Sequence, residues 1–132
     1  MNHNSVPQNI QNYHWTGSIV FLQEKKIRYF DSYHSDNLII LEKIFEQLNF
    51  EHLQNLGSEL VRSDWELTCS VDHATQKNAY DCEVFTLVLA EMVSRRCLNF
   101  DFTQDQMSNY RKKIGYEIIN GALLDEKLCA DY

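Results

Sequence analysis

The 132-residue chain lacks a long apolar run, a C-x-x-C pair and an excess of positive charge. Its first twenty-three residues contain no Lys, Arg, Asp or Glu, but Asn, Gln and Pro interrupt them, which argues against a secretory signal and a membrane span. The net charge of −7 argues against nucleic-acid binding, because phosphate neutralisation needs clustered Lys and Arg. We therefore expect no membrane or nucleic-acid partner. We interpret the basic clusters at residues 25–28, 95–96 and 111–113 as solvated faces, with contact between one of them and an acidic protein partner as the alternative.

The four cysteines, Cys69, Cys82, Cys97 and Cys129, form no close pairs. Without a secretory signal, thiols are the default state and an intracellular, reducing compartment is expected. Structural zinc sites usually combine two closely spaced ligand pairs, and only Cys69-x-x-x-His73 comes near that pattern. We expect no metal and no cofactor.

The size and composition indicate a single domain over residues 1–132. A chain of this length can bury roughly two thirds of its unfolded surface, and 44% hydrophobic with 23% charged residues is ordinary for a globular protein. After a short polar lead at residues 1–5, residues 16–22 (TGSIVFL) and 26–30 (KIRYF) are rich in β-branched and aromatic side chains, and a polar turn separates them. They predict a β-hairpin.

The rest of the chain is mainly helical in pattern. The broadest apolar face lies over residues 82–97, which predicts a central buried helix. Other expected elements are helices at 36–49 (capped by Ser35 or Asp36), at 52–62 (interrupted by Gly57) and at 103–120 (Thr103 and Gln106 as a capping box, Gly121 at the end), a strand at 65–71 and a loop at 72–81. Met107, Ile114 and Ile118 should pack the last helix on the core, and the tail 125–132 should be exposed.

Cys82 stands where a polar, turn-rich stretch gives way to the apolar helix. The free N–H groups and positive dipole end of a helix favour a thiolate over a thiol, which makes Cys82 a candidate nucleophile. A small buried core residue is the plainer interpretation for an isolated cysteine. The chemistry therefore requires partners.

The predicted hairpin supplies two partners, His14 and Asp31. Folding about the turn brings them to the same end of neighbouring strands, where the carboxylate could orient the imidazole that accepts the thiol proton. Gln76, six residues before Cys82, could bind an oxyanion together with the backbone N–H of Cys82. Taken alone, each has a plainer interpretation: a solvated histidine, a turn-forming aspartate and a surface glutamine.

Several motifs occur in order along residues 6–124. They are His14-Trp15, Tyr-Phe-Asp-Ser at 29–32, Gln-x-Asn-x-x-Asp-Cys at 76–82, and a C-terminal set of 102–107, Tyr110-Arg111, Glu117-Ile118 and Gly121. The pattern resembles the C-terminal part of the catalytic domain of the ubiquitin-like-protein-specific cysteine proteases, which process and deconjugate SUMO and related modifiers.

The resemblance implies an α+β, papain-like cysteine protease architecture, with a small, mostly antiparallel sheet packed against a central buried helix. It implies Cys82 as nucleophile, His14 as general base, Asp31 as its orienting acid and Gln76 as oxyanion-hole donor. Trp15 is expected to pack beside the catalytic centre. The implied partners are SUMO or a related modifier and its conjugates, in the nucleus or cytoplasm.

Two departures from the family pattern keep other functions open. Glu83 stands where the family usually has glycine, so its charge opposes thiolate formation and its side chain could obstruct a ligand. Catalytic domains of the family carry an N-terminal portion that supplies much of the surface that binds the modifier. We expect that portion to be missing from this chain, carried elsewhere, or dispensable. We expect a thiol isopeptidase or endopeptidase acting through a thioester; the alternatives are a catalytically impaired modifier-binding module and a same-fold protease on ordinary peptide bonds.

Overall fold

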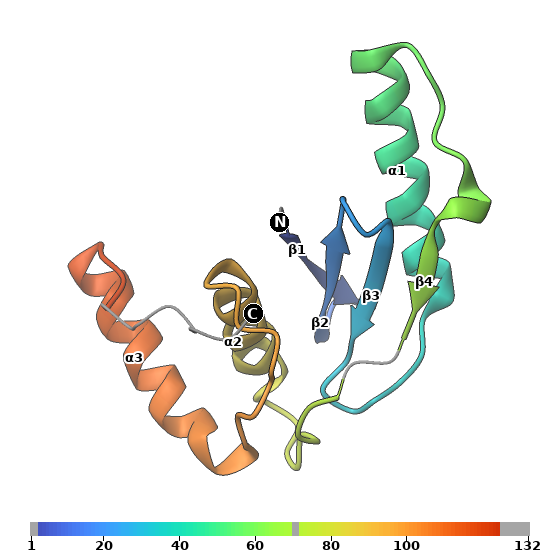
Figure 1. Cartoon of the computed structure of the whole chain (residues 1–132). Coiled ribbons are helices and arrows are strands. Elements are labelled where there is room, and N and C mark those ends of the chain that lie inside the picture. Colours follow the sequence, from blue (N-terminus) through green and yellow to red (C-terminus); the bar gives the residue numbers. More distant parts are fainter. Residues whose placement is uncertain (1–2, 70–71, 125–132) are drawn as a thin grey trace.

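The computed structural model describes residues 3–69 and 72–124, whose strands form a four-stranded sheet (Figure 1). The strands lie side by side in chain order: β1 (His3–Ile10), β2 (His14–Phe21), β3 (Lys26–Phe30) and β4 (Glu66–Thr68). The pairs β1–β2 and β2–β3 are antiparallel, whereas β4 joins β3 in parallel. The predicted α+β class with a mostly antiparallel sheet is confirmed.

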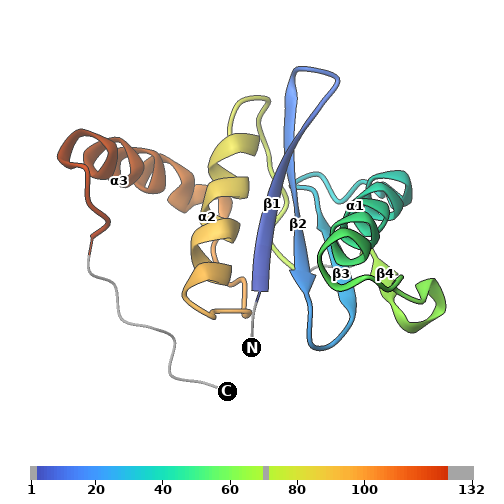
Figure 2. The same cartoon turned by 90° about the horizontal axis from the view of Figure 1, so that it is seen from above.

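Helices cover both faces of this sheet. Side chains alternate along a strand, so Ile19 of β2 packs with α2 (Cys82–Ser94) and its neighbour Val20 packs with α1 (Leu38–Leu56). Figure 2 shows the two helices on opposite sides, with α3 (Met107–Asn120) outside α2. The α2 residues buried in the core are Cys82, Val84, Phe85, Thr86, Val88, Leu89 and Val93, which confirms the predicted central helix.

The hairpin is confirmed, but the sheet has one strand more than the sequence predicted. Residues taken as the end of a polar lead belong to β1, which pairs with the whole length of β2. β1 lies at the edge of the sheet, where Pro7 is tolerated because its missing N–H can face away from the ladder. Its polar composition conceals it from a hydrophobic-pattern search.

The segment after the hairpin forms one helix rather than two. α1 begins after Asn37, whose side chain accepts the Ile40 N–H, and continues to Leu56. Gly57 has a φ of +72° and donates its N–H to Leu53, so it ends the helix instead of interrupting it. The predicted caps Ser35 and Asp36 are therefore wrong. A short turn, η1 (Arg62–Asp64), then leads to β4.

The C-terminal helix follows its prediction except on one face. A turn, η2 (Gln104–Gln106), precedes α3, and the Gln106 side chain accepts the Thr103 N–H at 2.7 Å. Met107 is fully buried and Ile114 packs against the core, but Ile118 is 75% exposed, so its predicted core position is wrong. The predicted tail at 125–132 and part of the predicted strand, residues 70–71, lie outside the described residues.

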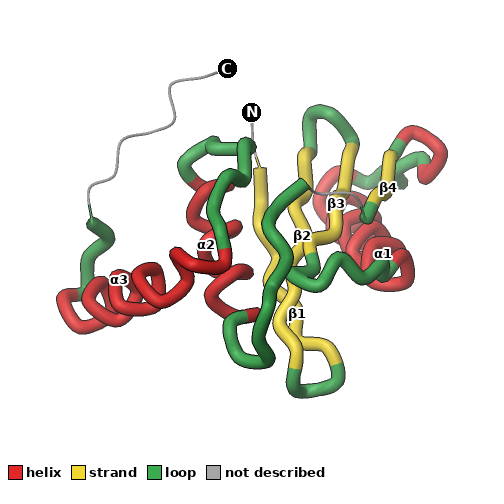
Figure 3. Tube along the Cα trace, turned by 90° about the horizontal axis from the view of Figure 1, so that it is seen from below, coloured by secondary structure: helices red, strands yellow, loops and turns green. Residues whose placement is uncertain are grey.

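The loop between β4 and α2 brings the chain from the end of the sheet to the start of α2 (Figure 3). Its described residues, 69 and 72–81, contain no helix or strand, as predicted for 72–81. Within the two described ranges, no helix combines the length and apolarity needed to cross a bilayer.

Candidate active site

His14 and Asp31 come together at one end of the hairpin. Because Gly17 of β2 pairs with Phe30 of β3, the start of β2 lies beside the residues that follow β3. The Nε2 atom of His14 is 2.9 Å from Oδ1 of Asp31, and Asp31 is 5% exposed. The hairpin argument thus correctly predicted that these side chains meet.

Tyr33 completes the surroundings of this pair. Its backbone N–H donates to Oδ1 of Asp31 at 2.8 Å, and its ring stacks on the His14 imidazole with 5.2 Å between centroids. With Nε2 of His14 directed at the carboxylate, Nδ1 is the ring nitrogen left to exchange a proton with another group. Tyr33 directly follows the Tyr-Phe-Asp-Ser motif at residues 29–32, but no feature of the sequence indicated its role.

Cys82 is the first residue of α2 and is 4% exposed. Its thiol donates to Oε2 of Glu83 across 3.6 Å; among the described groups, Glu83 and not His14 is the hydrogen-bond partner of the sulfur. The structure therefore joins His14 to Asp31 directly and leaves Cys82 unlinked to them by a hydrogen bond. Catalytic hydrogen bonds often tighten only when substrate binds.

Asn78 fixes the backbone just before α2, the helix that begins with Cys82. Its Oδ1 accepts the backbone N–H groups of Tyr80 and Asp81 at 3.2 and 3.0 Å, and its amide nitrogen donates to Oδ2 of Asp81 at 2.7 Å. Asparagine is suited to such local turns because its short side chain can replace a backbone acceptor. The turn places Asp81 at the N-terminal end of α2, one residue before Cys82.

Gln76 is buried, so its interpretation as a surface residue is wrong. Its Oε1 accepts the Ser32 hydroxyl at 2.5 Å, and its backbone N–H donates to the Ser32 carbonyl at 2.8 Å. One amide hydrogen goes to the Asn78 carbonyl at 2.5 Å, which the Tyr33 hydroxyl also donates to. The amide nitrogen also donates to Oδ1 of Asn78 across a long 3.4 Å, so its second hydrogen must leave that contact to serve an oxyanion.

Two residues after α2, Gln104 and Arg111, bind the loop that precedes Cys82. Gln104 of η2 donates to Oδ2 of Asp81 at 2.9 Å and accepts the Lys77 N–H at 2.8 Å. Nη2 of Arg111 lies 2.8 Å from Oδ1 of Asp81 and 2.8 Å from Oε1 of Glu83. Arg111 is 47% exposed, in keeping with the solvated face predicted for residues 111–113, although it also binds this loop; the interpretation is wrong at Lys113, which is 12% exposed and pairs with Glu91.

These contacts alter the protonation equilibria of the loop. Burial would raise the pKa of Asp81, but hydrogen bonds from Asn78, Arg111 and Gln104 outweigh it and lower that pKa. The bonds to Asp81 and Glu83 raise the pKa of Arg111. Asp81 is therefore an anion at neutral pH, and Arg111 is its counter-ion.

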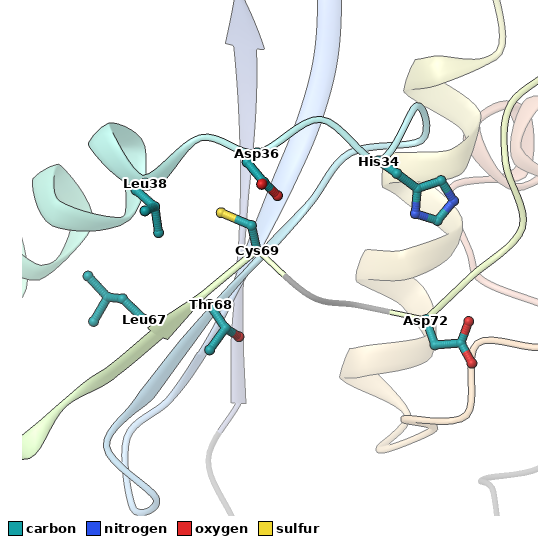
Figure 4. Close-up of a pocket in the computed structure, with 7 residues that line it drawn as sticks. All are labelled: His34, Asp36, Leu38, Leu67, Thr68, Cys69 and Asp72. Carbon is teal, nitrogen blue, oxygen red and sulfur yellow. The ribbon is translucent and has the colours of Figure 1, made fainter.

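Trp15 and Cys69 lie away from these hydrogen bonds. Trp15 follows His14 in β2, pairs with Asn9 of β1 and is 41% exposed; its supporting role stays a prediction. Cys69 lines a cavity of about 680 Å³, shown in Figure 4 with His34 and Asp36, and its sulfur accepts the Asn37 N–H at 3.4 Å.

Cys69 and Cys82 are free thiols, as expected for these two residues, and Cys129 lies outside the described residues. Groups of three or more His, Cys, Asp or Glu side chains placed to hold a metal do not occur in the described part of the chain.

The comparisons with known proteins agree with this arrangement. Residues 1–123 match the model of the Ulp1 protease family, C-terminal catalytic domain. The chain belongs to this family. A Sentrin-specific protease of Caenorhabditis elegans is 34% identical over 111 residues, which are 84% of this chain and 16% of that protein. Human Sentrin-specific protease 2 is 32% identical over 113 residues, 84% of this chain and 19% of that protein.

Solved Ulp1-family domains share the fold. The yeast Ulp1 C-terminal protease domain, in complex with Smt3, the yeast ortholog of SUMO, superposes with a TM-score of 0.72 at 23% identity, covering 89% of this chain and 52% of that one. The Ulp1-like SUMO protease catalytic domain of Chaetomium thermophilum gives a TM-score of 0.76 at 21% identity, covering 96% and 49%. The chain thus spans about half of these domains and less than a fifth of the two relatives above.

Proposed function

We propose that this Ulp1-family chain is a cysteine peptidase that removes SUMO or a related ubiquitin-like modifier from lysine side chains. The observation that carries the proposal is the part-buried His14–Asp31 pair, 2.9 Å apart, in a chain of this family that also has Cys82, the nucleophile we propose, at the start of a buried helix. The names of its relatives, Sentrin-specific proteases, and the Smt3 complex of yeast Ulp1 support the choice of modifier.

The proposed reaction has two stages. His14 takes the proton of the Cys82 thiol, and the sulfur attacks the carbonyl carbon at the modifier's C-terminus. The second amide hydrogen of Gln76 and the backbone N–H of Cys82 stabilise the oxyanion. The protonated imidazole then gives its proton to the departing lysine amine, which leaves a thioester that water hydrolyses. Asp31 holds the imidazole in the required tautomer and stabilises its charged form.

The same proposal covers organisation and location. Residues 1–132 would act as one protease domain, or as part of one, with the modifier and its conjugates as partners. The expected location is inside the cell, in the nucleus or cytoplasm, where such conjugates occur. The proposal requires no metal, cofactor, nucleic acid or membrane.

A modifier-binding module without catalysis is the second candidate. The hydrogen bond from the Cys82 thiol to Glu83 favours it, because a carboxylate beside the sulfur holds the proton that a nucleophile must lose. A protease of this fold on ordinary peptide bonds is the third candidate, and a peptide library tests it separately.

The deciding experiment uses ubiquitin-like modifiers that carry a C-terminal electrophile. The protein is incubated with a panel of these probes, and covalent adducts are detected by gel shift. The proposal predicts an adduct with at least one SUMO-type probe, absent in Cys82→Ala and strongly reduced in His14→Ala. Failure of every probe to label, with retained binding of an unreactive modifier, supports the binding module instead.

Glu83→Gly tests whether the glutamate obstructs the site. If its side chain blocks the approach of the modifier's tail, the glycine variant is labelled faster than the natural protein. An unchanged or lower labelling rate removes obstruction from the account.

A further inference from the structure

Two carboxylates flank the candidate nucleophile. Asp81 precedes Cys82 and Glu83 follows it, and Oε2 of Glu83 accepts the thiol hydrogen at 3.6 Å. Negative charges beside a thiol oppose the loss of its proton. Unless something offsets these charges, this is a poor position for a nucleophilic cysteine.

One guanidinium nitrogen reaches both carboxylates. Nη2 of Arg111 lies 2.8 Å from Oδ1 of Asp81 and 2.8 Å from Oε1 of Glu83, and it also donates to the Tyr80 carbonyl at 2.9 Å. The two oxygens of Glu83 thus have different partners: Oε1 is bound by the guanidinium, and Oε2 accepts from the sulfur. The guanidinium of Arg111 therefore binds the same carboxylate that accepts the hydrogen bond from the Cys82 thiol.

The other side chains around Cys82 do not supply a positive charge to offset the two carboxylates. Asn78 and Gln104 also bind Asp81, but both side chains are neutral. On the sheet side, His14 is paired with Asp31. In the described part of the chain, Arg111 of α3 is the cation that binds the two flanking carboxylates.

We propose that Arg111 is a positioning residue for the reaction at Cys82. By binding Glu83 and Asp81 together, it weakens the hold of Glu83 on the thiol proton and sets the pH range in which the sulfur reacts. The inference rests on the proposed function for the role of Cys82. Its test, however, measures the thiol directly and needs no modifier.

The test follows alkylation of Cys82 by iodoacetamide from mildly acidic to alkaline pH, quantified by peptide mass spectrometry. Cys69, a free thiol in the cavity of Figure 4, is the internal reference. In Arg111→Gln, we expect the Cys82 rate at neutral pH to fall about three- to tenfold, the smaller end reflecting solvent screening of this half-exposed arginine. The rate at alkaline pH, where every thiol is ionised, should be unchanged.

Matched variants separate charge from structure. Lys112→Gln removes the same charge from the next, exposed position of α3 and should leave the profile unchanged. Arg111→Lys should retain part of the natural rate because it keeps the charge without the planar fork. Glu83→Gln should react faster at neutral pH, and Arg111→Gln should cost less in that background than in the natural one.

Three results would overturn the inference: an unchanged profile in Arg111→Gln, an equal fractional loss at every pH, or the same loss with and without Glu83. If Arg111→Gln does not fold, Glu83→Gln decides, since an unchanged or slower neutral rate contradicts the role given to the carboxylate. A shifted alkylation profile in a protein that no modifier probe labels would sustain this inference while the proposed function fails.

Discussion

The two sides of the candidate site are built in different ways. On the sheet side, the β2–β3 ladder fixes the backbone, and the His14–Asp31 pair follows from its register. On the helix side, the loop before Cys82 contains no helix or strand and is held by side chains, above all Asn78 and Arg111. One half of the site is thus ordered by local pairing, and the other by contacts between residues as far as 45 positions apart.

This difference predicts which substitutions should lower reactivity alone and which should also lower stability. A change on the sheet side removes chemistry while the ladder preserves the fold. A change on the helix side loosens the segment before Cys82, the candidate nucleophile, so stability and reactivity should fall together. Ser32 connects the two sides, because it follows Asp31 in sequence and clamps Gln76 through both side chain and backbone.

The largest effect is expected from Asp31→Asn, which removes the carboxylate charge beside His14 on the sheet side. The amide keeps the shape but loses the charge that orients and stabilises the imidazole, so the labelling rate with a modifier probe should fall by roughly a hundredfold or more. The melting temperature should change little. The exposed Asp36→Asn serves as the control; an equal loss of rate there would remove the special role of Asp31.

Ser32→Ala should break the link between the two sides. Ser32 is fully buried, and its removal leaves Oε1 of Gln76 without its donor, which costs about 1–3 kcal/mol of unfolding free energy. Urea unfolding measures this loss, with the exposed Ser35→Ala as its matched control. A loss no larger than that of the control would show that the clamp does not hold Gln76.

The smallest expected effect is a pH dependence beside the helix-side loop. Burial, together with the stacked ring of His34, lowers the pKa of His73, which also packs on Phe30. An unfolded histidine binds a proton near pH 6.5, and the folded one only at lower pH, so the free energy of unfolding should fall as the pH drops below about 6.5.

His73→Gln should make that fall shallower, because a group that titrates differently in the two states has been removed. Urea unfolding at neutral and mildly acidic pH measures the slope, and His52→Gln on α1 provides the comparison. A variant slope equal to the natural one would assign the acid sensitivity to other groups.

The sequence predicted the sheet side well because its signals are local. The hairpin strands and the short turn between them are each contained within one segment, and so is the buried pattern of α2, the one helix-side element that the sequence also predicted. β1 was not predicted because an edge strand with Pro7 needs few apolar residues. The second predicted helix, 52–62, ran past Gly57, whereas the structure joins residues 52–56 to α1 and ends that helix at Gly57. The contacts on the helix side were not predicted for another reason. Those of Arg111 and Gln104 depend on how α3 packs, and the hydrophobic periodicity of the sequence does not encode that packing.

The most direct test of the whole account asks whether the two sides act on one sulfur. The iodoacetamide rate of Cys82, divided by that of Cys69 in the same sample, is compared at neutral pH between the natural protein and His14→Gln. If the imidazole accepts the thiol proton, this ratio should drop by about tenfold or more in the variant. An unchanged ratio would mean that the histidine of the sheet does not serve the cysteine of the helix, and the proposed peptidase would be contradicted.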